Sequence, residues 1–112
     1  MPRWTISAIT SLFTVLACTP AFAQIATQAE IDTGRQLAVQ TCGTCHATGT
    51  DDTSPLAKAP AFRNLGKLYP VSSLEEALAE GIVTGHDDMP QVEWESDRIV
   101  AFIAYLESIQ AK

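Results

Sequence analysis

The sequence predicts an all-α protein, and three observations lead to this fold class. Segments 29–41, 72–81 and 96–109 repeat apolar residues at the spacing of an amphipathic helix. No segment alternates apolar and polar residues with period two for long enough to form a strand. The loops between the helical segments are longer than helix packing alone requires, so we expect these loops to have a function.

The first helical segment, AEIDTGRQLAVQT at 29–41, leads directly into the sequence CGTCH at 42–46. Its inward face should consist of Ile31, Gly34, Leu37, Ala38 and Thr41. A proline-containing loop should follow at 47–61, and FRNLGKLY at 62–69 should form a short helix. Pro70 lacks a backbone N–H and should end that helix.

The segment SSLEEALAEG at 72–81 carries signals for both ends of a helix. Ser72 or Ser73 is the expected N-cap, and the glutamate three residues later would complete a capping box. Gly81 suits the position after the last helical residue. The apolar face would consist of Leu74, Ala77, Leu78 and Ile82.

The last helix is expected in SDRIVAFIAYLESI at 96–109, with Ser96 as its N-cap. Its apolar stripe should consist of Ile99, Phe102, Ile103 and Leu106. A chain of 112 residues has room for one domain built from these helices.

The first 23 residues are typical of a secretory signal peptide. Arg3 precedes an uncharged, mainly apolar run at 4–17, and small residues follow in Ala21-Phe22-Ala23. We therefore expect cleavage after Ala23, a signal peptide at 1–23, a mature domain at 24–112 and a periplasmic location. The run is short for a bilayer span, so no membrane span should remain after cleavage.

A lipid tether is the alternative that the N-terminal sequence leaves open. VLAC at 15–18 loosely resembles a bacterial lipobox, in which the cysteine becomes the lipidated first residue. Val15 and Leu16 are not the preferred residues of that motif. Lipidation of Cys18 would tether an otherwise soluble domain to the membrane.

The charge of the mature domain is strongly acidic. All 13 acidic residues lie beyond residue 29, and removal of Arg3 takes the formal net charge from −6 to −7. Nucleic acid is therefore disfavoured as a partner, because phosphate binding requires clustered Lys and Arg. A protein partner should present a basic docking patch.

The sequence CGTCH, from Cys42 to His46, is the attachment signature of c-type haem. Cys42 and Cys45 lie on one helical turn and can form thioethers with the two vinyl groups of a porphyrin. The histidine that follows then lies against one face of the ring, where its imidazole can bind the iron.

Other uses of these residues are weaker. A thioredoxin-like pair would follow a strand, whereas the segment before Cys42 is helical. A zinc site would need Cys42, Cys45 and both histidines, and His46 is adjacent to Cys45. A disulfide across two residues of a helix is strained, although export permits it.

Across 24–112 the chain resembles the small class I bacterial cytochromes c, whose helix, CxxCH, proline loop, Met loop and last helix occur in this order. The resemblance implies three to five short helices wrapped around one covalently attached haem. It also implies that Gly34, eight residues before Cys42, lets the first and last helices cross closely. AYLESI resembles the last-helix signature, with Tyr105 at the crossing, whereas Ala38 replaces a second aromatic residue of many members.

The loop APAF at 59–62 resembles the family's proline loop, which implies a second role for a proline. Its carbonyl would accept a hydrogen bond from the ring nitrogen of His46 that does not bind iron. Such a bond fixes the tautomer and makes the imidazole a better donor to the metal. Pro60 is the expected acceptor and Pro55 is the alternative.

Met89 is the expected second axial ligand of the iron. It lies in the polar loop VTGHDDMPQV and is the only methionine apart from Met1. It follows His46 by 43 residues and precedes Pro90, as in the family's Met loop. His86 is the alternative ligand and an open iron position is the third.

Two further residues are candidates for contact with the haem. Arg63 would pair with a propionate or else form an ordinary surface salt bridge. Trp94 would donate its indole N–H to a propionate, pack the haem edge, or simply belong to the core.

The expected function is single-electron transfer between redox proteins by a monomeric carrier rather than an enzyme. Iron with His46 and Met89 as ligands keeps no position for a substrate. A cytochrome subunit of an exported dehydrogenase is one alternative, and a gas-binding or peroxidatic haem protein is another.

Overall fold

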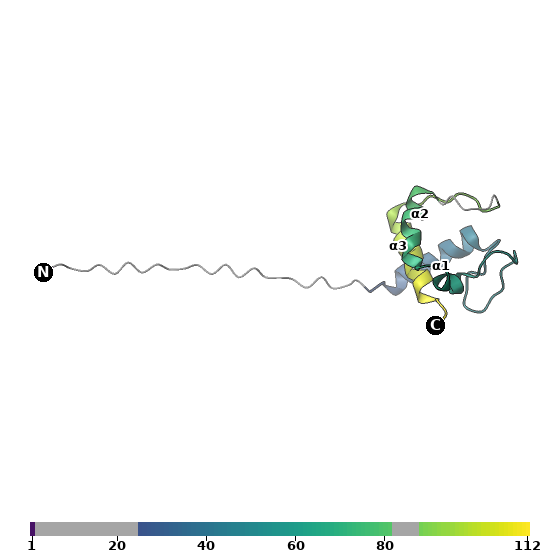
Figure 1. Cartoon of the computed structure of the whole chain (residues 1–112), viewed down its shortest axis with the longest axis horizontal. Helices are drawn as coiled ribbons and strands as arrows, with labels where there is room; N and C mark the ends of the chain where they lie inside the picture. The colour runs from purple at the N-terminus through teal and green to yellow at the C-terminus, as the bar shows by residue number, and fades with distance from the viewer. Residues whose placement is uncertain (2–24, 82–87) are drawn as a thin grey trace.

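The computed structural model describes Met1, residues 25–81 and residues 88–112. In these residues the chain forms helices and no strand, which confirms the all-α class (Figure 1). The elements in chain order are α1 (Gln28–Cys42), the 3₁₀ helices η1 (Phe62–Lys67) and η2 (Val71–Ser73), α2 (Leu74–Glu80) and α3 (Ser96–Ser108). The predictions on the signal peptide, Cys18, Ile82 and His86 fall outside the described residues.

Helix α1 begins with a capping box that the sequence analysis did not predict. The Thr27 hydroxyl accepts the Glu30 N–H at 3.2 Å, and the Glu30 carboxylate accepts the Thr27 N–H at 2.7 Å. Each bond satisfies an N–H group that the first helical turn leaves unpaired. The helix that follows buries Gly34, Leu37 and Ala38, as predicted, and ends at Cys42. Ile31 is half-buried, whereas Thr41 is exposed, so its predicted place on the inward face is wrong.

The crossing of α1 over α3 is the principal helix–helix contact of the fold (Figure 1). A Cβ at Gly34 would lie 1.9 Å from the Ala101 carbonyl oxygen and 2.7 Å from Cβ of Tyr105. No side chain fits at those distances, so the close crossing requires glycine here. The predicted role of Gly34 is confirmed.

The start of α2 differs from the prediction. Val71–Ser73 forms a 3₁₀ turn, and the Ser73 hydroxyl donates to the Pro70 carbonyl at 2.7 Å. Ser73 is the N-cap residue, as predicted, but its side chain makes no capping bond to α2, so the predicted capping box is wrong. The helix does end at Gly81, whose φ of +88° is readily adopted only by glycine.

Helix α3 contributes most of the buried side chains. Ile99, Phe102, Ile103 and Leu106 are all buried, as the apolar stripe predicted. The N-cap is Glu95 rather than Ser96, because the helix begins one residue earlier than expected. Phe102 contacts the Phe62 ring with the centroids 5.8 Å apart, which links α3 to η1.

The segment predicted as a short helix after the proline loop is the 3₁₀ helix η1. Its Gly66 N–H donates to the side-chain oxygen of Gln110 at 2.7 Å. The side-chain nitrogen of Gln110 in turn donates to the Phe62 carbonyl at 2.9 Å. The residues after α3 therefore hold η1 against the end of that helix.

In the described part of the chain, no helix is long and apolar enough to cross a membrane.

Candidate functional site

A cavity of about 250 Å³ lies where the end of α1 meets the segment between α2 and α3. Cys42, Cys45 and His46 line it from one segment, and Met89 and Val92 line it from the other. Further apolar side chains of the wall are Leu56, Ala59 and Pro90. Ligand sites typically combine such apolar walls with a few polar groups.

The two cysteines and the histidine are held by a turn that continues α1. The N–H groups of Cys45 and His46 both donate to the Cys42 carbonyl, at 3.1 and 3.0 Å. This turn brings both sulfur atoms and the imidazole to the same cavity. The arrangement allows one flat group to be attached through Cys42 and Cys45 and bound by His46.

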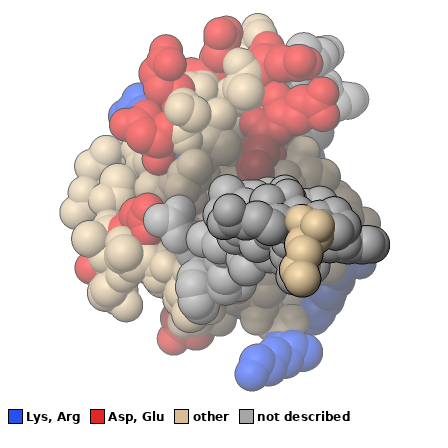
Figure 2. Space-filling model, turned by 90° about the vertical axis from the view of Figure 1, so that its left-hand side faces the viewer, with Lys and Arg blue, Asp and Glu red and all other residues tan. Residues whose placement is uncertain are grey.

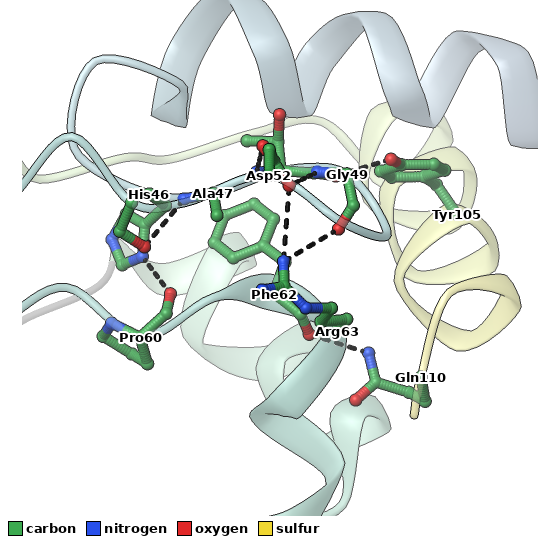
Figure 3. A network of polar contacts seen from close by, with 11 residues as sticks. His46, Ala47, Gly49, Asp52, Pro60, Phe62, Arg63, Tyr105 and Gln110 are labelled. Carbon is green, nitrogen blue, oxygen red and sulfur yellow. Dashed lines mark hydrogen bonds and ion pairs between the residues drawn. The ribbon is translucent and has the colours of Figure 1, made fainter. Parts of the chain in front are cut away.

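The orientation of the His46 ring is set by Pro60. Nδ1 of His46 lies 2.8 Å from the Pro60 carbonyl oxygen (Figure 3). A carbonyl can only accept, so Nδ1 carries the proton and Nε2 keeps its lone pair for a metal. Of the two prolines that the sequence left open, Pro60 rather than Pro55 is therefore the hydrogen-bond partner.

The segment after His46 is tied to the segment after Pro60. The Phe62 N–H donates to the Ala47 carbonyl at 2.9 Å, and the Ala47 N–H donates to the Ser54 hydroxyl at 2.9 Å. The Phe62 ring lies 5.0 Å from the imidazole centroid. His46 thus contacts a hydrogen-bond acceptor, Pro60, just before η1 and an aromatic ring, Phe62, at the first residue of η1.

Met89 lies in the same cavity as His46, although 43 residues separate the two in sequence. Its side chain is half-buried. The preceding residue, Asp88, forms an ion pair with Lys58, which joins the Met89 segment to the proline loop. The structure therefore brings together the two side chains predicted to bind the iron, whereas His86 lies outside the described residues.

The environment of Cys42 argues against a redox-active thiol pair. Burial, and next the neighbouring Cys45, raise the pKa of the free Cys42 thiol to about 11. Cys42 is also the last residue of α1, where the negative end of the helix dipole disfavours a thiolate. Thioredoxin-like cysteines need the opposite, a lowered pKa, so Cys42 is poorly suited to that chemistry.

Arg63 and Trp94 do not line the cavity. The Arg63 guanidinium donates to the Asp52 carboxylate at 3.3 Å and to the Gly49 carbonyl at 3.5 Å. The Trp94 ring packs edge-on against Phe102 at 5.0 Å, as a residue of the core boundary. Arg63 therefore forms a salt bridge, and Trp94 packs against the core. Contact of either residue with haem stays a prediction.

Asp52 is the main polar residue that the sequence analysis missed. Its carboxylate accepts the N–H groups of Thr48 and Gly49, each at 3.0 Å. The pattern TGTDD does contain a signal, because aspartate after a glycine turn commonly accepts nearby backbone N–H groups. The partner Arg63 is eleven residues away and could not be identified from such a local pattern.

The donor set suits c-type haem better than the other groups considered. Two cysteines can form thioethers, His46 has a free Nε2, and the Met89 thioether lies in the same cavity. Within residues 25–81 and 88–112, no three His, Cys, Asp or Glu side chains are grouped to hold a metal ion by themselves. Comparisons of the chain with family models, curated proteins and solved structures found no match.

Proposed function

We propose that this protein is a monohaem c-type cytochrome that carries single electrons between redox partners in the periplasm. The observation that supports this most strongly is the shared cavity of Cys42, Cys45, His46 and Met89. The Nδ1 proton of His46 is already engaged by Pro60, which leaves Nε2 available for iron. Haem bound here would supply an iron atom that cycles between the ferric and ferrous states.

Each residue of the cavity has a distinct task in this proposal. Cys42 and Cys45 would hold the haem through two thioethers, which addition of each S–H group across a vinyl group forms without net oxidation or reduction. His46 and Met89 would both bind the iron, which would leave no position for a substrate. The Pro60 carbonyl increases the basicity of the imidazole through Nδ1–H.

The apolar wall favours an electron carrier over a catalyst. Leu56, Pro90 and Val92 line the cavity and would shield part of the bound group from water. Exclusion of water together with histidine and methionine ligation favours the ferrous state and raises the reduction potential relative to two histidine ligands. The proposed protein therefore accepts electrons readily and performs no bond chemistry of its own.

The surface charge suggests what kind of partner docks. Asp and Glu side chains gather on the face shown in Figure 2, above all in its upper part, where Figure 1 places α2. Exposed acidic residues of α2 and of the segment leading into α3 are Glu75, Glu76, Glu80, Glu93, Glu95 and Asp97. A redox partner with a basic patch would be attracted to this side, with an association rate that falls as salt is added.

An optical and redox titration of the protein purified from periplasm tests the proposal. We expect a reversible one-electron transition, the visible bands of low-spin c-type haem, and slow binding of CO to the ferrous protein. A protein that contains no haem would refute the proposal. Rapid CO binding at neutral pH would instead indicate an open iron position and a gas-binding or peroxidatic protein.

A further inference from the structure

Two short segments, one of which carries His46, are joined by hydrogen bonds next to the His46 imidazole. Residues 46–49 follow α1, and residues 60–63 include the first two residues of η1. Hydrogen bonds join His46 to Pro60 and Phe62 to Ala47, at 2.8 and 2.9 Å (Figure 3). The direction of the His46 ring therefore depends on how firmly these two segments are held together.

The Asp52 carboxylate clamps the far end of the same pair of segments. One oxygen accepts the Thr48 N–H and the other accepts the Gly49 N–H, both at 3.0 Å. The second oxygen also accepts the Arg63 guanidinium, which belongs to the opposite segment, at 3.3 Å. Hydrogen bonds to an ionised carboxylate are stronger than neutral ones, so the clamp is well suited to fix the register.

Helix α3 anchors this assembly to the core. The buried Tyr105 hydroxyl donates to the Thr48 carbonyl at 2.5 Å. Thr48 is thus held on its N–H side by Asp52 and on its carbonyl side by Tyr105. The Ala111 N–H donates to the Arg63 carbonyl at 2.8 Å, which fixes the opposite segment to the end of the chain.

We propose that Asp52 is a positioning residue for His46. Its carboxylate holds residues 46–49 against residues 60–63 and thereby maintains the hydrogen bond from Nδ1 of His46 to the Pro60 carbonyl. Asp52 does not line the cavity, so it acts through the backbone rather than by contact with a bound group. The consequence for iron chemistry rests on the proposed haem function, whereas the positioning of the imidazole does not.

The test compares Asp52→Ala and Asp52→Asn with Asp51→Asn in the purified protein. Asp51 is the adjacent, exposed acid, and its replacement removes the same charge. The exchange rate of the His46 Nδ1 proton with solvent is measured by NMR, with any bound haem kept in its diamagnetic ferrous state. Loss of the clamp should speed this exchange by about tenfold in the Asp52 variants and leave it unchanged in Asp51→Asn.

The reduction potential provides a second readout. A weaker bond to Pro60 makes the imidazole a poorer donor, which destabilises the ferric state, so the potential should rise more in Asp52→Asn than in Asp51→Asn. Equal proton exchange and equal potentials in the two Asn variants would overturn the proposal, even if Asp52→Ala failed to fold. Absence of haem from the wild-type protein would refute the proposed function instead, and the proton exchange of His46 would still test Asp52.

Discussion

The Nδ1 nitrogen of His46 lies 2.8 Å from the carbonyl oxygen of Pro60, fourteen residues further along the chain. Because the carbonyl accepts, this contact leaves the Nε2 lone pair of the imidazole free. The same ring lines a cavity with Cys42, Cys45 and Met89. The proposed electron carrier follows from this set of four side chains and from the fixed tautomer of one of them.

Replacement of Met89 by alanine should open the sixth position of the iron. We expect the oxidised Met89→Ala protein to lose the weak far-red band that is typical of a methionine–iron bond in class I cytochromes c. The ferrous variant should bind CO rapidly, because no thioether competes for the position. His86→Ala is the matched control, and a spectrum that changes in His86→Ala but not in Met89→Ala would assign the ligand to His86.

The substitution Gly34→Ala should destabilise the fold strongly. The added methyl group would lie 1.9 Å from the Ala101 carbonyl oxygen, so α1 and α3 would have to move apart. We expect the free energy of unfolding to fall by at least about 2 kcal/mol in denaturant titrations. Gln36→Ala, at an exposed position of the same helix, should change it by no more than about 0.5 kcal/mol. Equal stabilities of the two variants would contradict the close crossing.

The hydroxyl of Tyr105 should make stability depend on pH in the alkaline range. Burial raises the pKa of Tyr105 above its usual value of 10 in the folded protein. The folded state therefore binds the phenolic proton more tightly than the unfolded state does. This contribution is fully present below pH 10 and is lost as the pH rises through the raised pKa.

The variant Tyr105→Phe separates this effect from general alkaline unfolding. At neutral pH the loss of the bond to the Thr48 carbonyl should cost about 1 to 2 kcal/mol. Above pH 10 the variant should lose less stability than the wild type, because it has no phenol to ionise at this position. At neutral pH Tyr69→Phe should cost less stability than Tyr105→Phe, since 37% of Tyr69 is exposed compared with 5% of Tyr105. Burial raises the pKa of Tyr69 as well, so the alkaline comparison is made between the wild type and Tyr105→Phe alone. Parallel pH curves for the wild type and Tyr105→Phe would contradict this prediction.

The features that could be predicted from the sequence depend on local patterns. The apolar stripe of α3 and the helix before Cys42 follow from spacing within one element. The role of Gly34 could be predicted because the resemblance to class I cytochromes c implies a close crossing of the first and last helices at this residue. Ser73 is the N-cap of α2, as predicted, but the predicted capping box is absent because the Ser73 hydroxyl bonds to the Pro70 carbonyl, a local alternative that competes with capping.

The contacts around the site required the three-dimensional arrangement. Both Pro55 and Pro60 precede η1, and only the path of the loop decides which carbonyl reaches His46. The Asp52 clamp joins residues up to fifteen positions apart, and Tyr105 reaches Thr48 across 57 positions. Such distances in sequence carry no periodic signal, so these residues could not be predicted from spacing.

The mass of the exported protein, measured under denaturing conditions, tests the central claim most directly. The account predicts the mass of residues 24–112 plus one haem that stays attached after unfolding. The variant Cys42→Ser/Cys45→Ser should lose this covalent haem. A wild-type mass without haem, from cells that attach haem to another c-type cytochrome, would contradict the assignment of Cys42, Cys45 and His46 as a haem site.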